Sequence, residues 1–301
     1  MNAAPVLIGY TAVVGFVAPY LLLRARWPHR APALAAAVWH ALVVSFSIGA
    51  ALAAYHLAMP AEHLNAGVMG LLNSCGMDVG AGDPGTADRL AVALPAAIGV
   101  ALTGSLAFHV VRARRARTRH REAVDMVGRH SLRLRATVLP YDVPAAYSLP
   151  GRHARIVISE AAVRQLTPEQ LGAVLEHEQA HISGRHHLVL AATDAFHSVF
   201  RPLPLARHAR EQTALLLEMV ADDWALRGHS GEVLATAMYE MAAASAPKGA
   251  FGAGGHTVLI RLKRVLGPRK APHPALRGAM AAMAVAVPLL PLLVACPPGV
   301  G

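Results

Sequence analysis

The chain has 301 residues, a formal net charge of +10 and a mean hydropathy of +0.40. Charged residues make up only 15% of it, well below the share in a typical soluble domain, which indicates membrane-spanning segments. Much of the basic excess borders apolar runs, and aromatic residues amount to only 5%. This pattern fits topology signals better than base-stacking surfaces, so we expect no direct binding of nucleic acid.

Four apolar stretches are long enough to cross a bilayer, which takes about 20 helical residues. They are residues 5–23, 32–58, 90–111 and 278–295. Arginines follow the first and third stretches, whereas the segment 59–89 carries Glu62, Asp78, Asp83 and Asp88 but only one arginine. The positive-inside rule therefore places residues 112–277 in the cytoplasm, and the loop 59–89, both termini and the tail after the fourth helix outside. Cys75 and Cys296 fall on the outer side, where a disulfide between them is possible but not fixed by sequence.

The cytoplasmic block 112–277 predicts a mainly helical α+β domain. Residues 137–139, 145–149 and 155–159 have the composition of short strands. A helix begins after Thr167, because Thr167 can cap it, Pro168 suits its first turn and Gln170 completes a capping box. Further helices are expected at residues 211–226 and 232–244, followed by a glycine-rich loop at 247–255.

The main chemical signal is an H-E-x-x-H motif inside that capped helix. His177 and His181 are four residues apart, so both imidazoles lie on one helix face and can reach one zinc ion. Glu178 lies beside them, where it can act as general base toward a water. Catalytic zinc generally takes three protein ligands. The two cysteines lack metal-ligand spacing, so the third ligand must be another residue type.

Glu218 is the candidate for the third ligand, on the next long helix. Asp222 is four residues further, on the same face, where it can accept the second ring N–H of a ligand histidine, most plausibly that of His177. Asp223 is about 100° further round the helix and should not reach the same atom. A solvated pair of helix charges is the competing interpretation, although the stretch before Glu218 is apolar.

These segments resemble the membrane gluzincins of the BlaR/MecR type and, more distantly, of the HtpX and CAAX prenyl protease type. The resemblance covers about residues 137–266, with PAAYS at 144–148, IVIS at 156–159, EQLGAVLEHEQAH at 169–181 and EMVAD at 218–222. It implies a membrane-bound zinc endopeptidase with one zinc per chain. The sequence ends at Gly301 without the external penicillin-binding domain of that family's antibiotic receptors, so we expect no direct β-lactam sensing.

Three further groups of residues are candidates for roles at or near the site. Ala145, Ala146, Tyr147 and Ser148 form a candidate edge strand for an extended substrate. His256 or Arg261, or less plausibly Tyr147, is expected to stabilise the oxyanion. His186 and His187 are interpreted as polar residues near a helix end, although His186 could compete for metal.

The resemblance implies a cytoplasmic protein substrate, such as a transcriptional repressor encoded nearby. The alternatives are quality control of membrane proteins, as in HtpX, and a non-enzymatic membrane receptor or scaffold with a structural metal site. The intact Glu178 disfavours the last of these, because a purely structural site needs no general base.

Overall fold

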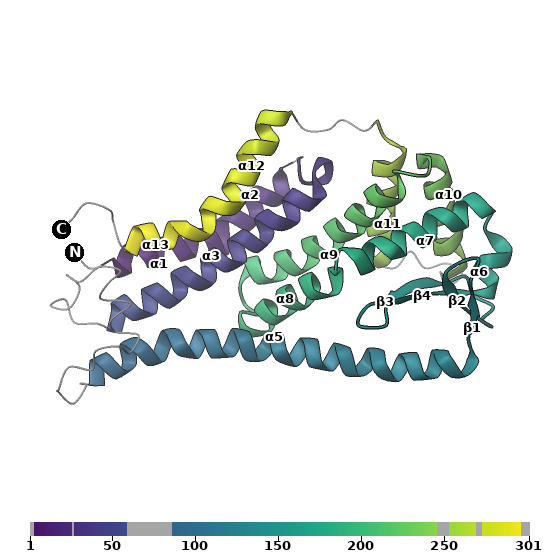
Figure 1. Cartoon of the computed structure of the whole chain (residues 1–301). Helices are drawn as coiled ribbons and strands as arrows, with labels where there is room; N and C mark the ends of the chain where they lie inside the picture. Colours follow the sequence, from purple (N-terminus) through teal and green to yellow (C-terminus); the bar gives the residue numbers. More distant parts are fainter. Residues whose placement is uncertain (1–2, 26, 59–85, 246–252, 269–272, 296–301) are drawn as a thin grey trace.

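The computed structural model describes residues 3–25, 27–58, 86–245, 253–268 and 273–295. It is mainly helical, with one small sheet (Figure 1). The membrane-type helical segments are α1 (Ala4–Ala12), a π-helical turn (Val13–Val17), α2 (Ala18–Arg24), α3 (Pro32–Ala58), α5 (Thr86–Val127), α12 (Pro274–Ala286), a 3₁₀ turn (Val287–Leu289) and α13 (Leu290–Ala295). The other helices are α6 (Glu160–Gln165), α7 (Pro168–Ser183), α8 (His186–Val199), α9 (Pro204–Ala225), α10 (Gly231–Ser245) and α11 (Ala253–Leu266).

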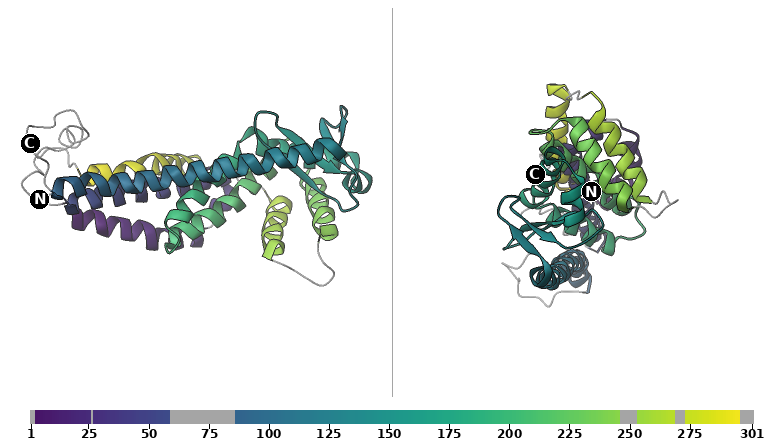
Figure 2. Two further views of the ribbon diagram at one scale, coloured as in Figure 1. Left: turned by 90° about the horizontal axis from the view of Figure 1, so that it is seen from below. Right: turned by 90° about the vertical axis from the view of Figure 1, so that its right-hand side faces the viewer.

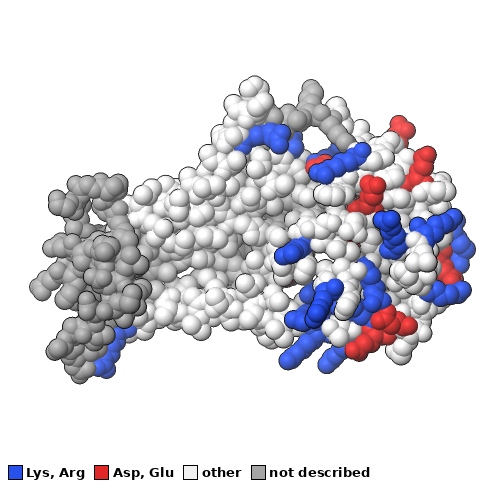
Figure 3. Space-filling view, viewed as in Figure 1, with Lys and Arg blue, Asp and Glu red and all other residues white. Residues whose placement is uncertain are grey.

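Four helical stretches among the described residues are long and apolar enough to cross a membrane: Ala4–Arg24, Pro32–Ala58, Arg89–Val127 and Pro274–Ala295. Three of them are largely exposed, with many apolar side chains pointing outward, whereas half of the apolar window of Pro32–Ala58 is buried. Figure 3 shows a broad band without charged side chains over the middle of this face, where these helices lie side by side, and charged side chains gathered mainly over the right half. Such an apolar exterior suits hydrocarbon, which supports membrane association.

The sheet has the order β1-β2-β4-β3. Its strands are β1 (Arg129–Ser131), β2 (Ala136–Leu139), β3 (Ala146–Leu149) and β4 (Arg155–Ser159). The β2–β4 pair is parallel, and the other two pairs are antiparallel. The strand β3 is therefore an edge strand among those described, and α7 packs next to it.

The hairpin of α8 and α9 joins the membrane-type helices to the sheet half of the molecule. Phe196 of α8 and Phe200 just after it lie edge-on to Phe46 of α3, with ring centroids 5.9 and 5.3 Å apart. This apolar cluster also holds Trp39 and, from α9, Leu216. Because the start of α9 is fixed against α3, the later turns of α9 have a defined position beside α7.

The expected strands and helices are present, with some differences in extent. Strand β1 was not expected from sequence, and α9 begins at Pro204 rather than near 211. The helix α5 continues without a break through residue 111, where we expected the third span to end, and runs the length of the molecule (Figure 2). Residues 253–255 belong to α11 rather than to the expected loop, whereas Cys75 and Cys296 lie outside the described residues.

Candidate metal centre and active-site cleft

Helix α7 presents both histidines of the motif. Its start is fixed by the predicted capping box: the Gln170 N–H donates to Thr167 Oγ1 at 3.3 Å, and the Thr167 N–H donates to Gln170 Oε1 at 2.9 Å. His177 and His181 then lie one turn apart on the same face, with their Nε2 atoms 3.2 Å from each other. The two imidazoles therefore point at one place.

Glu218 of α9 completes a triangle of possible ligands. Its Oε2 lies 3.5 Å from His177 Nε2, and its Oε1 lies 3.4 Å from His181 Nε2. Ligand atoms at zinc distances of about 2.0–2.1 Å in tetrahedral geometry are separated by about 3.3–3.4 Å. The three side chains thus fit a zinc ion, and they form the one group of possible metal ligands found among the described residues.

Asp222 supports His177 from behind. Its side chain is fully buried, and its Oδ1 lies 3.1 Å from His177 Nδ1, the ring nitrogen that faces away from Glu218. A carboxylate in this position fixes the orientation of a ligand histidine and raises its basicity. Asp223 points elsewhere and pairs with Arg264 at 2.7 Å, as the helical phase predicted.

His186 contacts His181, the second histidine of the motif. This contact was not predicted from the sequence. The chain turns sharply after α7, with Arg185 in the left-handed region at φ 48°, and this turn folds buried His186 back onto the site. Its Nδ1 lies 2.8 Å from His181 Nδ1. A Cβ at Gly184 would lie 2.5 Å from His186 Nε2, so glycine there makes the close approach possible. His186 therefore lies at a helix end, as expected, but it is also buried against His181, which was not predicted.

Arg261 of α11 ties the two carboxylates together. Its Nε and one terminal nitrogen donate to the two Asp222 oxygens at 2.9 and 2.7 Å, and its other terminal nitrogen lies 2.8 Å from Glu218 Oε2. The role of Arg261 as oxyanion donor stays a prediction, because these contacts show only that it pairs with the carboxylates of Glu218 and Asp222. The side chain of His256 lies outside what the structure describes.

Burial, hydrogen bonds and neighbouring charges together shift the pKa values of this cluster. Burial raises the pKa of Glu218 and Asp222, but hydrogen bonds and charges from His177 and Arg261 outweigh it and lower both pKa values to about 2. Burial lowers the pKa of His177, yet Asp222 and Glu218 raise it to about 9, which marks a strongly basic imidazole. The pKa of His181 falls to about 4, chiefly through burial. Ionised carboxylates and a neutral His181 are the forms in which these groups bind metal.

Glu178 lies between the metal triangle and the edge strand. Burial raises the pKa of its carboxyl, which is partly opposed by the charge of His177 and by hydrogen bonds from the side chain and backbone of Ser148. A raised pKa suits a general base working near neutral pH. The contact with Ser148 also places this base beside β3.

Residues alternate along β3 between the two faces of the sheet, and only one face meets the cleft. Ala146 lines the cleft and packs with α7. Tyr147 points the other way, and its hydroxyl lies 2.6 Å from His120 Nε2 on α5. The structure therefore gives no support to Tyr147 as an oxyanion donor. Ala145 precedes the strand and is tied to Ser159, whose N–H donates to Ala145 O at 2.9 Å.

A cleft of about 380 Å³ opens over the metal triangle. His177, Glu178, Glu218 and Arg261 line its polar part. Its apolar wall is formed by Pro144, Ala145, Ala146, Val174, Leu234, Met238, Met241, Ala242 and Val258. This wall was not predicted from the sequence, although Leu234, Met238 and Met241 recur on α10 at the i, i+4, i+7 spacing of one helix face.

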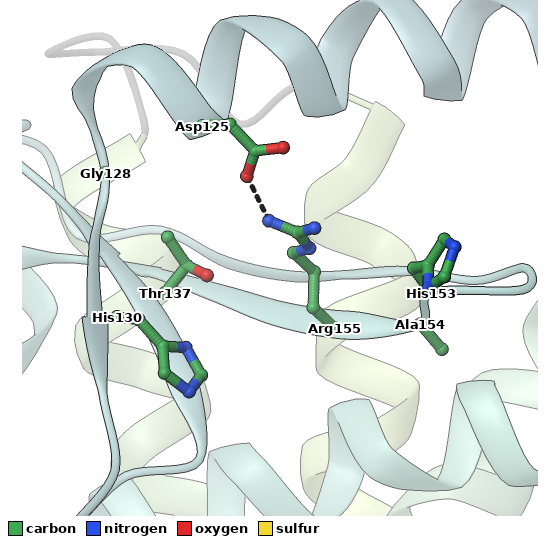
Figure 4. A pocket seen from close by; sticks show the side chains of 7 residues that line it. All are labelled: Asp125, Gly128, His130, Thr137, His153, Ala154 and Arg155. Carbon is green, nitrogen blue, oxygen red and sulfur yellow. Dashed lines mark hydrogen bonds and ion pairs between the residues drawn. The ribbon is translucent and has the colours of Figure 1, made fainter.

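A separate hollow of about 580 Å³ lies at the end of α5, near β1 and β4. Figure 4 shows Asp125 of α5 pointing at Arg155 of β4, with which it forms an ion pair, and His130 and His153 at either side. None of the predicted site residues lines this hollow. It is therefore distinct from the metal-ligand cluster.

The segment that carries these three ligand candidates matches a known protein family. Residues 110–242 match the model of peptidase family M48. The M48 match contains His177, His181 and Glu218, and it supports a metallopeptidase of this family. M48 peptidases depend on a metal, typically zinc, which agrees with the geometry of the triangle. No match was found among curated proteins or among solved structures.

Proposed function

We propose that this protein is a membrane-bound zinc endopeptidase that cleaves a cytoplasmic protein. The observation that carries the proposal is the triangle of His177, His181 and Glu218, with Glu178 between it and an edge strand. The M48 match supports the peptidase class, and the long apolar helices support attachment to the membrane.

Each residue of the centre has a definite task in this proposal. His177, His181 and Glu218 would hold the zinc, which supplies Lewis-acid polarisation of a carbonyl when bound. Glu178 takes the proton from the attacking water and passes it to the leaving amine. Asp222 keeps His177 oriented, and Arg261 balances the charge of the two carboxylates.

The edge strand and the apolar wall indicate what the substrate must look like at the scissile bond. An extended peptide can pair by strand addition with the outer edge of β3, which no other described strand occupies, and this brings a backbone carbonyl toward Glu178. The cleft beside it would accept an apolar side chain, because its wall is built from aliphatic residues and methionines. The substrate segment is thus expected to be unfolded and apolar at one position.

Two substrate classes follow from the resemblance stated above. A transcriptional repressor would be the substrate if the chain works in a BlaR/MecR-type signal response, and a membrane protein would be the substrate in HtpX-like quality control. The cleft geometry suits both, because each offers extended segments. A receptor or scaffold with a structural metal site is disfavoured by Glu178, a partly buried carboxylate with a raised pKa that is not one of the three ligands.

The deciding experiment compares wild type with Glu178→Gln. The full chain is purified in detergent, its zinc content is measured, and its cleavage of an unfolded reporter protein is followed. The amide cannot accept a proton but is close in size, so the variant should keep its zinc and lose at least about 99% of its cleavage, as expected for loss of general-base catalysis. Glu176→Gln is the matched control, because Glu176 is a half-exposed neighbour that faces His229 at 3.6 Å. Undiminished cleavage by Glu178→Gln would remove Glu178 from the mechanism.

A further inference from the structure

A second pocket lies where α5 meets the α8–α9 hairpin, apart from the metal centre. Its volume is about 650 Å³. It is lined by His109, Arg112, Ala113, Ala116 and Arg117 of α5, by His187, Leu190, Ala191, Asp194, His197 and Ser198 of α8, and by Arg201 and Arg210 around the start of α9. The small side chains of Ala113, Ala116 and Ala191 leave room between the helices.

The lining of this pocket carries an excess of positive charge. Asp194 is its one acidic residue, and it is engaged by Arg210, whose Nε lies 2.5 Å from Asp194 Oδ1. Arg112, Arg117 and Arg201 have no carboxylate within ion-pair distance among the described residues. The pKa of His187 is lowered, first by burial and then by the charges of Arg117 and Arg185. The pocket therefore has an uncompensated attraction for an anion.

The position of this pocket on α5 indicates which kind of anion it could bind. The apolar run 90–111 of α5 ends where the arginines of the pocket begin. Two contacts bind α8 to α5 at this level: Ser105 Oγ donates to Ala195 O at 3.2 Å, and His109 Nε2 lies 2.8 Å from Ser198 Oγ. Phe108 and Val111, just before Arg112, are exposed apolar side chains. The pocket thus straddles the boundary between the apolar and the basic surface.

We propose that this pocket binds the phosphate headgroup of an anionic phospholipid, with the acyl chains lying along the apolar surface of α5. At this boundary a lipid headgroup is presented directly to the arginines. Guanidinium groups match phosphate oxygens with paired hydrogen bonds, and basic pockets beside membrane helices suit anionic headgroups. A bound lipid would hold α5 and the α8–α9 hairpin together, and so fix the hairpin whose second helix, α9, carries Glu218.

The test uses the full chain in detergent, titrated separately with phosphatidylglycerol and with zwitterionic phosphatidylcholine, and followed by native mass spectrometry. We expect one phosphatidylglycerol to be retained per chain, and no defined stoichiometry with phosphatidylcholine. The double variant Arg112→Gln/Arg117→Gln should bind phosphatidylglycerol about tenfold more weakly or worse. Arg115→Gln/Arg119→Gln is the matched control, since it removes the same charge from exposed positions of α5 that do not line the pocket.

The outcomes separate a built site from general attraction of a basic surface. Equal weakening by the two double variants would overturn the proposal, as would displacement of the lipid by an excess of inorganic phosphate, which would identify the site as one for a free anion. Arg201→Gln, on the hairpin, provides an independent arm and should also weaken binding. Circular dichroism of each variant must show unchanged helix content, and a variant that fails this check is replaced in the comparison by Arg201→Gln.

Discussion

The Nδ1 atoms of His186 and His181 lie 2.8 Å apart, so a histidine of α8 supports a metal-ligand candidate of α7. Asp222 does the same for His177 at 3.1 Å. Each of the two imidazoles of the motif is therefore held from its Nδ1 side, and both Nε2 atoms remain directed at the third ligand candidate. Such second contacts restrict the ring orientation and strengthen donation to the metal.

Replacing His186 should weaken the metal centre. We expect His186→Ala to lower zinc affinity or cleavage by about 10–100-fold, the usual effect of losing a partner behind a ligand histidine. Zinc retention during dialysis against a graded chelator measures this. His187→Ala is the control, because His187 lines the pocket beside α5 instead of the metal centre. Gly184→Ala should mimic His186→Ala, since its Cβ would displace the His186 ring. Equal, small effects of the two histidine variants would show that the contact between His186 and His181 does not strengthen zinc binding.

Asp222 and Asp223 are neighbours in sequence but should differ sharply in effect. Asp222→Asn weakens the support of His177 and should reduce zinc affinity or cleavage by about 10–100-fold. Asp223→Asn weakens only a pair with Arg264 that lies on the partly exposed side of α9, so its effect should be several-fold smaller. Zinc content and cleavage measured for both variants decide the matter. A larger effect from Asp223 would contradict the phase of α9 seen here.

Arg261 should matter most when zinc is absent. Arg261→Met leaves Glu218 and Asp222 without their shared cation, and breaking such a buried pair costs about 3–5 kcal/mol. Bound zinc compensates part of the charge of Glu218, so the destabilisation should be smaller in the zinc-loaded protein. Thermal unfolding of the full chain with zinc and with a chelator measures the difference. Arg264→Met, which breaks the pair with Asp223, should give the same shift in both conditions.

The orientation in the membrane is open to a direct test. The distribution of arginines predicts residues 112–277 on the cytoplasmic side and the loop 59–89 outside. Reporter fusions after Arg30 and at Gly249 should give cytoplasmic signals, whereas fusions at Gly80 and Gly301 should give external ones. A cytoplasmic signal at Gly80 would contradict this topology and with it the proposed cytoplasmic substrate.

The sequence by itself determined the parts of the site that lie within one helix. The spacing of His177 and His181, the cap at Thr167 and the phase that separates Asp222 from Asp223 all follow from 3.6 residues per turn. Composition likewise indicated the apolar helices, because about 20 apolar residues in a row have few other uses. These features are local, so no knowledge of the packing was needed.

Only the tertiary structure decided how separate elements meet at the site. The turn at Gly184 and Arg185 returns His186 to His181, and α11 brings Arg261 to two carboxylates of α9. Periodicity cannot show such contacts, because it fixes the face of a helix but not its neighbour. The basic pocket is another case. In the sequence, the arginines of α5 were interpreted as topology signals. Only the packing of the α8–α9 hairpin against α5 places some of them around one cavity.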